Sequence, residues 1–554
     1  MPTLTELVNT YIGTSDRVNV ENTDVQVIVD GVDFFASIAQ ELGKCTGQGD
    51  FVYVMGWVMD CQTPLQTPAP AGGPNSVGDW LAALNTAQVD VRVLLWGSDG
   101  VTATLPEPVA NGLALKWLRD HGVKDVALDC GGSWMSSRHT KAVIVGAGQS
   151  AASGTLTAYL SGMDFGTNRI DDPSHKAILP NPQNGVHCAA SGARWHDAGA
   201  RLSGAAARDV LADFMARWNA CAVEGNTNAL DIPTDLHASD PGATRAVIDG
   251  WNYDEYTHLP SPMTQMDMTS ISTTNASVVG GGGIATRVLR SEGADKMDSW
   301  RKVRPAIPDI PASGPLTELQ ATLTNAFTSA QKYIYVEDQS IHTWSTTWML
   351  RGSEHTLMYP LLVDAMRRGV KVVLVSRPDG ADKIQETQSL AHDLNLIVAD
   401  LNRHEPATLD NFAVYKPYCI TVHSKLVIVD DVFMTIGSGN FFDSSWTGLD
   451  SECSVAIVSD TTSNLVRDLR VRLWSEHVAQ LPAIIGTDPT EVNWNSAVAR
   501  ELQDVDHALG IWRSQWRTPG TTGQSVNFSF EPASPSPPDG PPGPRLQIIY
   551  PEVY

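Results

Sequence analysis

The stretch Val422-His-Ser-Lys-Leu-Val-Ile-Val-Asp430 occurs in a second version, Arg138-His-Thr-Lys-Ala-Val-Ile-Val-Gly146. The similarity extends to the strand-like runs before each copy, which pair as Phe51–Trp57 with Tyr333–Gln339 and Val91–Trp96 with Val370–Val375. Trp57 lies 82 positions before His139, and Gln339 lies 84 positions before His423. Three ordered matches at nearly equal spacing predict two related halves, each with one copy of the motif.

Each predicted half alternates short β-branched runs with helical stretches, which indicates an α/β fold around a parallel or mixed sheet. The predicted helices lie near Val77–Leu84, Gly112–His121, Leu316–Gln331 and Tyr359–Gly369. We expect an N-terminal half over residues 1–225, a linker or insertion over 226–290, a C-terminal half over 291–490 and an extension over 491–554. The linker contains a polar, Gly-rich stretch, and the extension ends in a Pro-rich tail.

Composition excludes several classes of protein. The chain has 554 residues, of which 42% are hydrophobic, and a formal net charge of −24. Such an acidic chain is poorly suited to coat a nucleic acid or to adsorb to an anionic membrane. No run approaches the roughly 20 apolar residues that a membrane-spanning helix needs, and no cleavable signal peptide is visible. We therefore expect a soluble monomer, cytoplasmic or exported, with the compartment open.

The seven cysteines are scattered and include no Cys-x-x-Cys pair, which argues against a structural zinc site. They do not form a disulfide scaffold either, although one or two bridges stay open.

The duplicated motif carries the candidate chemistry. Because side chains alternate along a strand, His139 and Lys141 point the same way, as do His423 and Lys425. Bringing the halves together would place two imidazoles and two ammonium groups in one cleft. This set suits phosphodiester chemistry without a metal: one histidine attacks phosphorus, the other protonates the leaving alkoxide, and the lysines offset the phosphoryl charge. A single His-x-Lys is more often structural, but its repetition in register favours a shared site.

These residues resemble the phospholipase D superfamily, and within it the eukaryotic-type subgroup, whose mark is His-x-Lys-(x)4-Asp followed by a Gly/Ser–Asn stretch. The resemblance rests on the second motif and on Ile436-Gly-Ser-Gly-Asn440, Gly448-Leu-Asp-Ser-Glu452, Leu473-Trp-Ser-Glu-His477, Gly162-Met-Asp164, Arg169-Ile-Asp171 and Trp195-His-Asp197. It implies two pseudo-symmetric α/β/α sandwich halves that share one central cleft.

The resemblance also implies a role for each residue. His139 would be the nucleophile and His423 the general acid and later the base, although the reverse assignment stays open. Asp450 would orient His139, and Asp171 would orient His423. The phosphate would be held by Lys141, Lys425, Asn440 and Asp164. The motif would be supported by Asp430, Gly437, Ser438 and Glu452.

Three positions depart from the family pattern: Gly146 replaces the Asp of the first motif, Ser444 an Arg and Ser161 a Gly. The motif Asp ends its strand, so we expect it to brace a turn, and its loss to cost local stability. We interpret His196 as structural, and we expect Glu337 and Asp338 either to contact a head group or to cap a helix. The Gly-rich turn Gly146–Ala151 is too weak a signal for a dinucleotide site.

The expected function is that of a phospholipase D. It would cleave the head-group phosphodiester of a glycerophospholipid to phosphatidic acid and an alcohol, with transfer to small alcohols in competition. The alternatives are a phosphatidyltransferase that makes phospholipids, a non-catalytic lipid-binding homologue and, less favoured by the net charge of −24, a nuclease. The partner would be phospholipid at a membrane or micelle surface. The chemistry requires no cofactor or metal, and activation by a divalent ion stays open.

Overall fold

The computed structural model describes most of the two halves. The described residues are 2–13, 17–20, 23–69, 72–97, 106–129, 136–150, 154–172, 195–224, 283–294, 297, 313–341, 358–376, 401, 404–417, 421–477, 497–516, 527–528, 546–548 and 551–552. The predicted Gly-rich linker, up to residue 282, and the Pro-rich tail lie outside them.

The first half is built on a seven-stranded mixed sheet among the described residues. In spatial order its strands are β1 (Thr23–Val29), β8 (Ala198–Gly204), β6 (Thr155–Ser161), β5 (Ala142–Ala147), β2 (Phe51–Gly56), β3 (Asp90–Trp96) and β4 (Asp125–Asp129). Strands β2, β3 and β4 are parallel, and the other neighbours pair antiparallel. Every residue of β2 and β5 is buried, which explains why both read as continuous apolar runs.

The second half repeats this arrangement. Its strands, in spatial order, are β10 (Leu316–Thr317), β9 (Ile284–Glu292), β17 (Glu452–Ser459), β16 (Phe433–Gly437), β15 (Lys425–Val429), β11 (Tyr333–Asp338), β12 (Lys371–Ser376), β13 (Phe412–Pro417) and β19 (Leu546–Ile548). Without the edge strands β10 and β19, seven strands remain in this sheet. Taken in spatial order, they match the seven strands of the first sheet one by one in position and pairing direction. The predicted duplication and the α/β fold class are confirmed.

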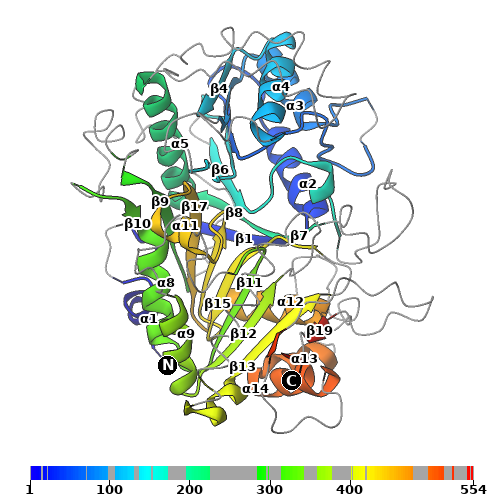
Figure 1. Cartoon of the computed structure of the whole chain (residues 1–554). Helices are drawn as coiled ribbons and strands as arrows, with labels where there is room; N and C mark the ends of the chain where they lie inside the picture. The colour runs from blue at the N-terminus through cyan, green and yellow to red at the C-terminus, as the bar shows by residue number, and fades with distance from the viewer. Residues whose placement is uncertain are drawn as a thin grey trace.

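Helices cover the sheets on the sides that face away from the partner half (Figure 1). The first sheet carries α2 (Gly31–Leu42), α3 (Val77–Thr86) and α4 (Pro106–Asp120), and the second carries α1 (Leu4–Tyr11), α8 (Glu318–Ser329) and α9 (Met358–Arg367). The four predicted helices are therefore present, as α3, α4, α8 and α9, with boundaries shifted by a few residues. The N-terminal helix α1 packs on the second half, although the sequence placed it with the first.

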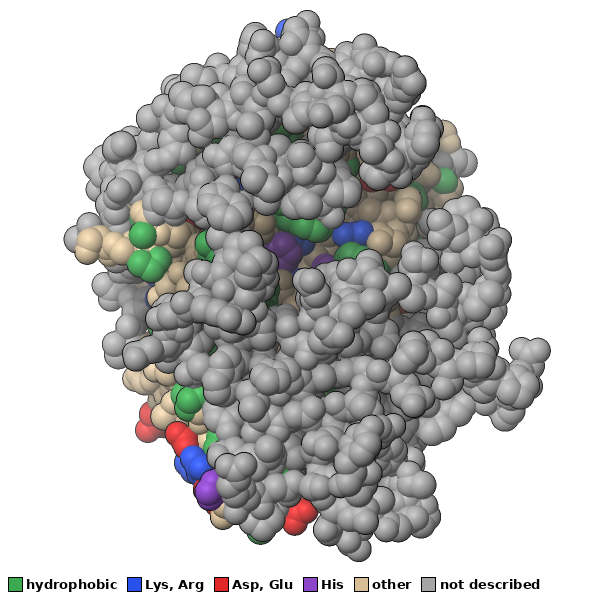
Figure 2. Space-filling view, viewed as in Figure 1, with side chains coloured by type: hydrophobic (Ala, Val, Ile, Leu, Met, Phe, Trp, Pro, Cys, Tyr) green, Lys and Arg blue, Asp and Glu red, His purple; other side chains and the backbone are tan. Residues whose placement is uncertain are grey.

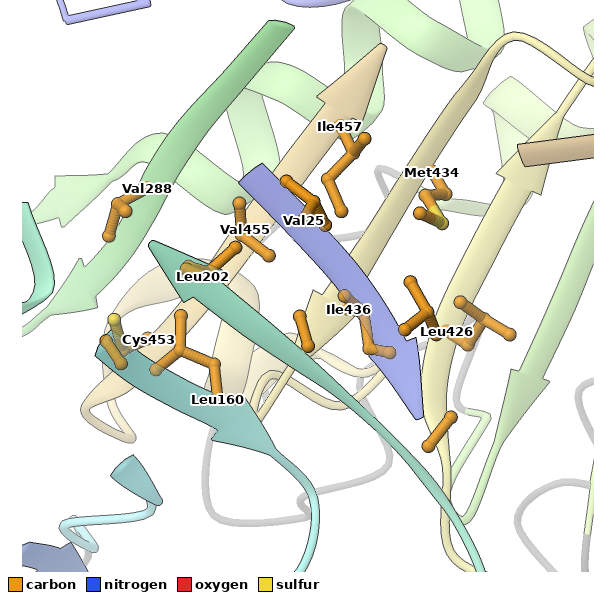
Figure 3. Close-up of a cluster of buried hydrophobic side chains, with 14 of the residues drawn as sticks. Val25, Leu160, Leu202, Val288, Leu426, Met434, Ile436, Cys453, Val455 and Ile457 are labelled. Atoms are coloured by element: carbon orange, nitrogen blue, oxygen red, sulfur yellow. The ribbon is translucent and has the colours of Figure 1, made fainter. Parts of the chain in front are cut away.

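The facing sides of the two sheets share one hydrophobic core. Val25, Leu160 and Leu202 of the first sheet meet side chains of the second (Figure 3). The second sheet contributes Val288, Leu426, Met434, Ile436, Cys453, Val455 and Ile457. Helices α5 (Ala205–Glu224) and α12 (Leu465–His477) pack into the same core. Because this core is continuous, each half is held in a fixed position against the other.

Two boundaries differ from the sequence-based division. Strand β9 begins at Ile284 and lies inside the second sheet, so the second half starts before residue 291. Strand β19 joins the edge of the same sheet, although it belongs to the predicted C-terminal extension. A strand's place in a sheet depends on its pairing partner, and neither strand falls in the stretches of sequence that repeat between the halves.

Asp430 directly follows β15 and braces the turn there. Its Oδ1 accepts the N–H groups of Lys332 and Tyr333 at 2.8 and 2.9 Å, and its Oδ2 accepts the Gln331 N–H at 2.8 Å and the Tyr11 hydroxyl at 3.0 Å. In the first half, the Phe51 ring fills the corresponding space, because a Cβ at Gly146 would lie 2.2 Å from it. The missing Asp of the first motif is thus replaced by an aromatic contact.

We expect Asp430→Ala to lower the free energy of unfolding by about 2 kcal/mol, because several donors lose an ionised acceptor. Urea unfolding followed by tryptophan fluorescence measures the change. The control is Asp120→Ala, which removes a surface pair with Lys116 and should change stability by less than about 0.5 kcal/mol. Equal effects of the two substitutions would contradict the bracing role.

Candidate active site

Each motif histidine is anchored to the other half through its main chain. The N–H of His139 donates to the carbonyl of Ser451 at 3.0 Å, and the N–H of His423 donates to the carbonyl of His196 at 2.8 Å. The second contact continues a short parallel ladder between β7 (Trp195–His196) and β14 (Thr421–Val422). The two motifs therefore meet at the boundary between the halves.

The imidazole of each histidine is oriented by a carboxylate from the other half. His139 Nδ1 lies 3.1 Å from Glu452 Oε1 and 3.0 Å from the Ser438 carbonyl oxygen. His423 Nδ1 lies 2.7 Å from Asp197 Oδ2. In both cases the carboxylate belongs to the residue that follows the main-chain partner of the histidine. This crossed arrangement fixes the ring orientation of both histidines.

The structure gives these ring contacts to Glu452 and Asp197, whereas the family resemblance named Asp450 and Asp171. Asp450 Oδ1 accepts the N–H and the hydroxyl of Ser137 at 2.9 and 2.8 Å, so it braces the loop before His139 rather than its ring. Asp171 is fully buried beside α2, where its carbonyl accepts the Val32 N–H at 3.0 Å. The Nδ1 position of His423 that the resemblance gave to Asp171 is taken by Asp197.

The two lysines make matching contacts. The Nζ of Lys141 donates to the His139 carbonyl at 2.7 Å, and the Nζ of Lys425 donates to the His423 carbonyl at 2.7 Å. Lys141 also lies 3.4 Å from Asp164 Oδ2. Burial is the main cause that lowers the pKa of both lysines, that of Lys425 to about 8. Two buried ammonium groups at the boundary between the halves form a natural site for an anion such as a phosphate.

The two orienting carboxylates differ in their surroundings. Glu452 accepts hydroxyls of Ser438 and Ser445, each at 2.6 Å. Burial opposes its ionisation, but His139, Lys141 and Ser438 outweigh burial and lower the pKa of Glu452. Asp197 instead faces Gly162, where a Cβ would lie 2.6 Å from Oδ2.

Burial raises the pKa of Asp197 to about 7. Burial, followed by the positive charges of Lys425 and Arg169, lowers the pKa of His423 well below its ordinary value. Since the two groups share one proton along a 2.7 Å hydrogen bond, they titrate as a unit.

Aromatic side chains flank both histidines. Trp195 stacks on His423 with ring centroids 4.1 Å apart. The Arg169 guanidinium lies over the Trp195 ring, 3.7 Å from its centroid. Trp57 meets His139 edge-on at 5.8 Å. Figure 2 shows histidine and Lys or Arg side chains, with hydrophobic ones beside them, near the middle of the view.

Three further predicted residues border this site. Asn440 is buried, its N–H donates to the Ser445 hydroxyl, and its amide oxygen has no hydrogen-bond partner among the described residues. Asp164 Oδ1 accepts the N–H groups of Trp57 and Val58 at 2.9 and 3.0 Å. Gly437 lies against β17, where a Cβ would be 2.4 Å from Ser454 Cα. These contacts shape the loops around the lysines.

Sequence reasoning missed Asp197, Glu452, Trp195 and Trp57 as neighbours of the histidines. Glu452 had been given only a supporting role, and Asp197 was named only in the family motif. A signal for the pair was available, because β8 and β17 occupy equivalent places in the two sheets. Asp197 directly precedes β8, and Glu452 is the first residue of β17.

No helix among the described residues is long and apolar enough to cross a membrane.

Comparisons with known proteins identify the family. A family model described as "Phospholipase D" matches residues 46–275, and one described as "Cardiolipin synthase, PLD-like domain" matches residues 323–474. Phospholipase D A of Dictyostelium discoideum is 26% identical over 343 residues, which cover 52% of this chain and 22% of that protein. Phospholipase D alpha 1 of Carica papaya is 22% identical over 550 residues, covering 79% of this chain and 63% of that protein.

The chain thus spans less than two thirds of the length of either relative. Among solved structures, phosphatidylserine synthase from Haemophilus influenzae Rd KW20 aligns with a TM-score of 0.45 and 11% identity, over 80% of this chain and 83% of that one. The matched family models cover both halves, each with its motif histidine and lysine. This chain belongs to the phospholipase D superfamily.

Proposed function

We propose that the protein is a phospholipase D that cleaves the head-group phosphodiester of glycerophospholipids, such as phosphatidylcholine or phosphatidylethanolamine, to phosphatidic acid and an alcohol. The observation that carries the proposal is the crossed pair of histidines, each with a carboxylate from the other half and a lysine two residues on. The superfamily membership supports phosphodiester chemistry, and the choice of a lipid substrate is our inference from the names of the relatives.

His139 is the proposed nucleophile. A carbonyl oxygen only accepts, so the contact with the Ser438 carbonyl requires a proton on His139 Nδ1. The lone pair is then on Nε2, which attacks phosphorus and forms a phosphohistidine as the bond to the head-group oxygen breaks. Lys141 and Lys425 offset charge on the phosphoryl oxygens, and Asn440 and Asp164 complete the phosphate site in the proposal.

His423 is the proposed general acid and base. The Asp197–His423 unit, with the pKa of Asp197 at about 7, holds its proton near neutral pH and can deliver it to the leaving alkoxide. The same unit then takes a proton from water, which attacks the phosphohistidine and releases phosphatidic acid. A small alcohol in place of water gives transphosphatidylation. No step requires a metal.

A second candidate is a phosphatidyltransferase that uses the same intermediate to build a phospholipid. It is favoured by one observation, the match of residues 323–474 to the family model described as "Cardiolipin synthase, PLD-like domain". The two candidates differ in the acceptor, which is water in one case and a lipid or head-group alcohol in the other.

We expect the protein to convert phosphatidylcholine vesicles to phosphatidic acid in EDTA and, with a little ethanol present, also to phosphatidylethanol. Mass spectrometry of the lipid products measures both. Product only after adding glycerol, serine or phosphatidylglycerol as acceptor would support the transferase. Vesicle binding without product under every condition would contradict both enzymes and support a lipid-binding role.

A further inference from the structure

A group of five ionisable side chains lies behind the second motif and takes no part in the proposed chemistry. We call it the His196 cluster, and its members are Asp30, His196, Glu337, Glu476 and His477. They come from the end of β1, β7, β11 and α12, and each is at most 1% exposed. The cluster therefore joins elements of both halves in a region without access to solvent.

Both ring nitrogens of His196 face carboxylates. Nδ1 lies 2.9 Å from Asp30 Oδ1 and 3.0 Å from Glu476 Oε1, and Nε2 lies 3.1 Å from Glu337 Oε1. Ionised carboxylate oxygens only accept, so three of them within 3.1 Å of the ring nitrogens favour a proton on both nitrogens. Burial works against a charged ring, but Glu476, Asp30 and Glu337 outweigh it and raise the pKa of His196 well above its ordinary value.

The pKa of Glu337, which faces His196 Nε2, is shifted in the direction that a cationic His196 would cause. Burial alone would raise the pKa of Glu337, yet His196 and His477 outweigh it and hold that pKa well below the ordinary value. His477 Nε2 lies 2.9 Å from Glu337 Oε2. Geometry and charge thus agree on an ionised Glu337 against a cationic His196.

Three hydrogen bonds join the His196 cluster to the second motif and to Asp197. The His196 carbonyl accepts the His423 N–H at 2.8 Å, and Glu337 Oε1 accepts the Ser424 hydroxyl at 2.6 Å. The Asp30 N–H donates to the carbonyl of Asp197 at 2.7 Å. Asp197 is the residue directly after His196 at the end of β7. The contacts that hold the His196 ring therefore also hold the main chain from which Asp197 reaches His423.

The same side chains also have the composition of a metal site: His196, Glu337 and His477 form one candidate group, and Asp30, His196 and Glu476 another. The contacts favour protons over a metal ion. Both Glu337 oxygens already accept hydroxyls at 2.6 Å, from Ser424 and Tyr335.

We propose that His196 is a positioning residue, a permanently charged imidazolium buried between the halves that orients the Asp197–His423 unit. Its charge also keeps Asp197 more acidic than burial alone would allow, since the cationic ring lowers the pKa of Asp197. The groups that face His196 are Asp30, Glu337 and Glu476, with Asp197 beside it and His477 across Glu337. The kinetic part of this proposal rests on the proposed function, and the charge state does not.

The first test needs no substrate. In protein labelled with ¹⁵N-histidine, long-range ¹H–¹⁵N spectra distinguish an imidazolium from both neutral tautomers, and His196→Gln assigns the signal. We expect two protonated nitrogens from pH 6 to pH 9. A neutral His196 at pH 8 would overturn the proposal, as would one tightly bound metal ion per chain in wild type that His196→Gln lacks.

The second test separates positioning from a merely structural effect. We expect His196→Gln to lower kcat by about 50-fold with KM within about twofold. We also expect the pH limb that reports the Asp197–His423 unit to move up by about one unit, because a nearby positive charge is lost. His121→Gln, at an exposed histidine stacked on Trp117, is the control and should match wild type.

A lower kcat with an unmoved pH limb would overturn the positioning role, because lost or misfolded enzyme lowers the rate without moving a pKa. The double variant His196→Gln with Glu337→Gln adds a check. It should be more stable than His196→Gln alone, because it removes the buried carboxylate left without its cation. If wild type turns over no lipid, the proposed function fails, and the spectra still decide the charge state of His196.

Discussion

Replacing either motif histidine by alanine should reduce turnover of phosphatidylcholine by at least about 10³-fold, and the double variant should be little worse than either single one. Residues that act as a unit in a covalent mechanism show this lack of additivity. Here the unit spans the two halves, since each ring is held by a carboxylate of the other half. The measurement is phosphatidic acid formation by His139→Ala, His423→Ala and the double variant. His121→Ala, at the exposed end of α4, is the matched control.

The covalent intermediate distinguishes the two histidines. After rapid quenching at alkaline pH, where phosphohistidine survives, peptide mass spectrometry should find the phosphatidyl group on His139. His423→Ala should slow its hydrolysis more than its formation if the leaving alcohol is acidic enough to depart without help. An adduct on His423 would reverse the assigned roles. Full activity of His139→Ala would mean that the first half does not contribute a catalytic histidine.

The internal repeat predicted the two-half fold because the same short strand-like runs occur in both halves in the same order. The runs around Phe51 and Tyr333 became the equivalent strands β2 and β11, at the centre of the two sheets. The apolar runs after Lys141 and Lys425 became β5 and β15 beside them. Buried strands are apolar along their whole length, so these four strands could be recognised from the sequence.

The orienting carboxylates did not follow from the sequence, for a physical reason. His423 and Asp197 are 226 positions apart, and their contact depends on how one half docks on the other. The halves are joined by a core of apolar side chains, and the sequence of that core does not show which polar residues will meet when the halves dock. Several buried acids lie near each motif, and only the docking selects one.

The same limit applies to His196. Its sequence context, between Trp195 and Asp197, suggested a structural residue, which accounts for its burial. It did not reveal that acids from β11 and α12 would converge on both ring nitrogens. A buried charge is defined by all of its neighbours at once, and these neighbours come from three distant segments.

Neutralising the orienting carboxylates should have the next largest effect. We expect Asp197→Asn and Glu452→Gln each to lower kcat by about 10² to 10⁴-fold, because an amide can present the wrong hydrogen-bonding group to the ring and cannot stabilise an imidazolium. Asp171→Asn and Asp450→Asn are the matched comparison, since Asp171 is buried and Asp450 half-buried near the site, and the Nδ1 contacts of both histidines are made by other acids. They should lower kcat by less than about tenfold. The measurement is the steady-state rate of lipid cleavage for all four variants, with unfolding midpoints to exclude loss of fold.

The pH dependence gives this prediction a sign. The protonated Asp197–His423 unit delivers the proton to the leaving group, so kcat/KM of wild type should fall as pH rises through about 7, where the pKa of Asp197 lies. Asp197→Asn removes the anion that favours a proton on His423, while burial, Lys425 and Arg169 continue to lower the pKa of His423. The alkaline limb should therefore move to lower pH in Asp197→Asn and stay in place in Asp171→Asn. A limb that moves only in Asp171→Asn would restore the family-based assignment and contradict the contact between Asp197 and His423.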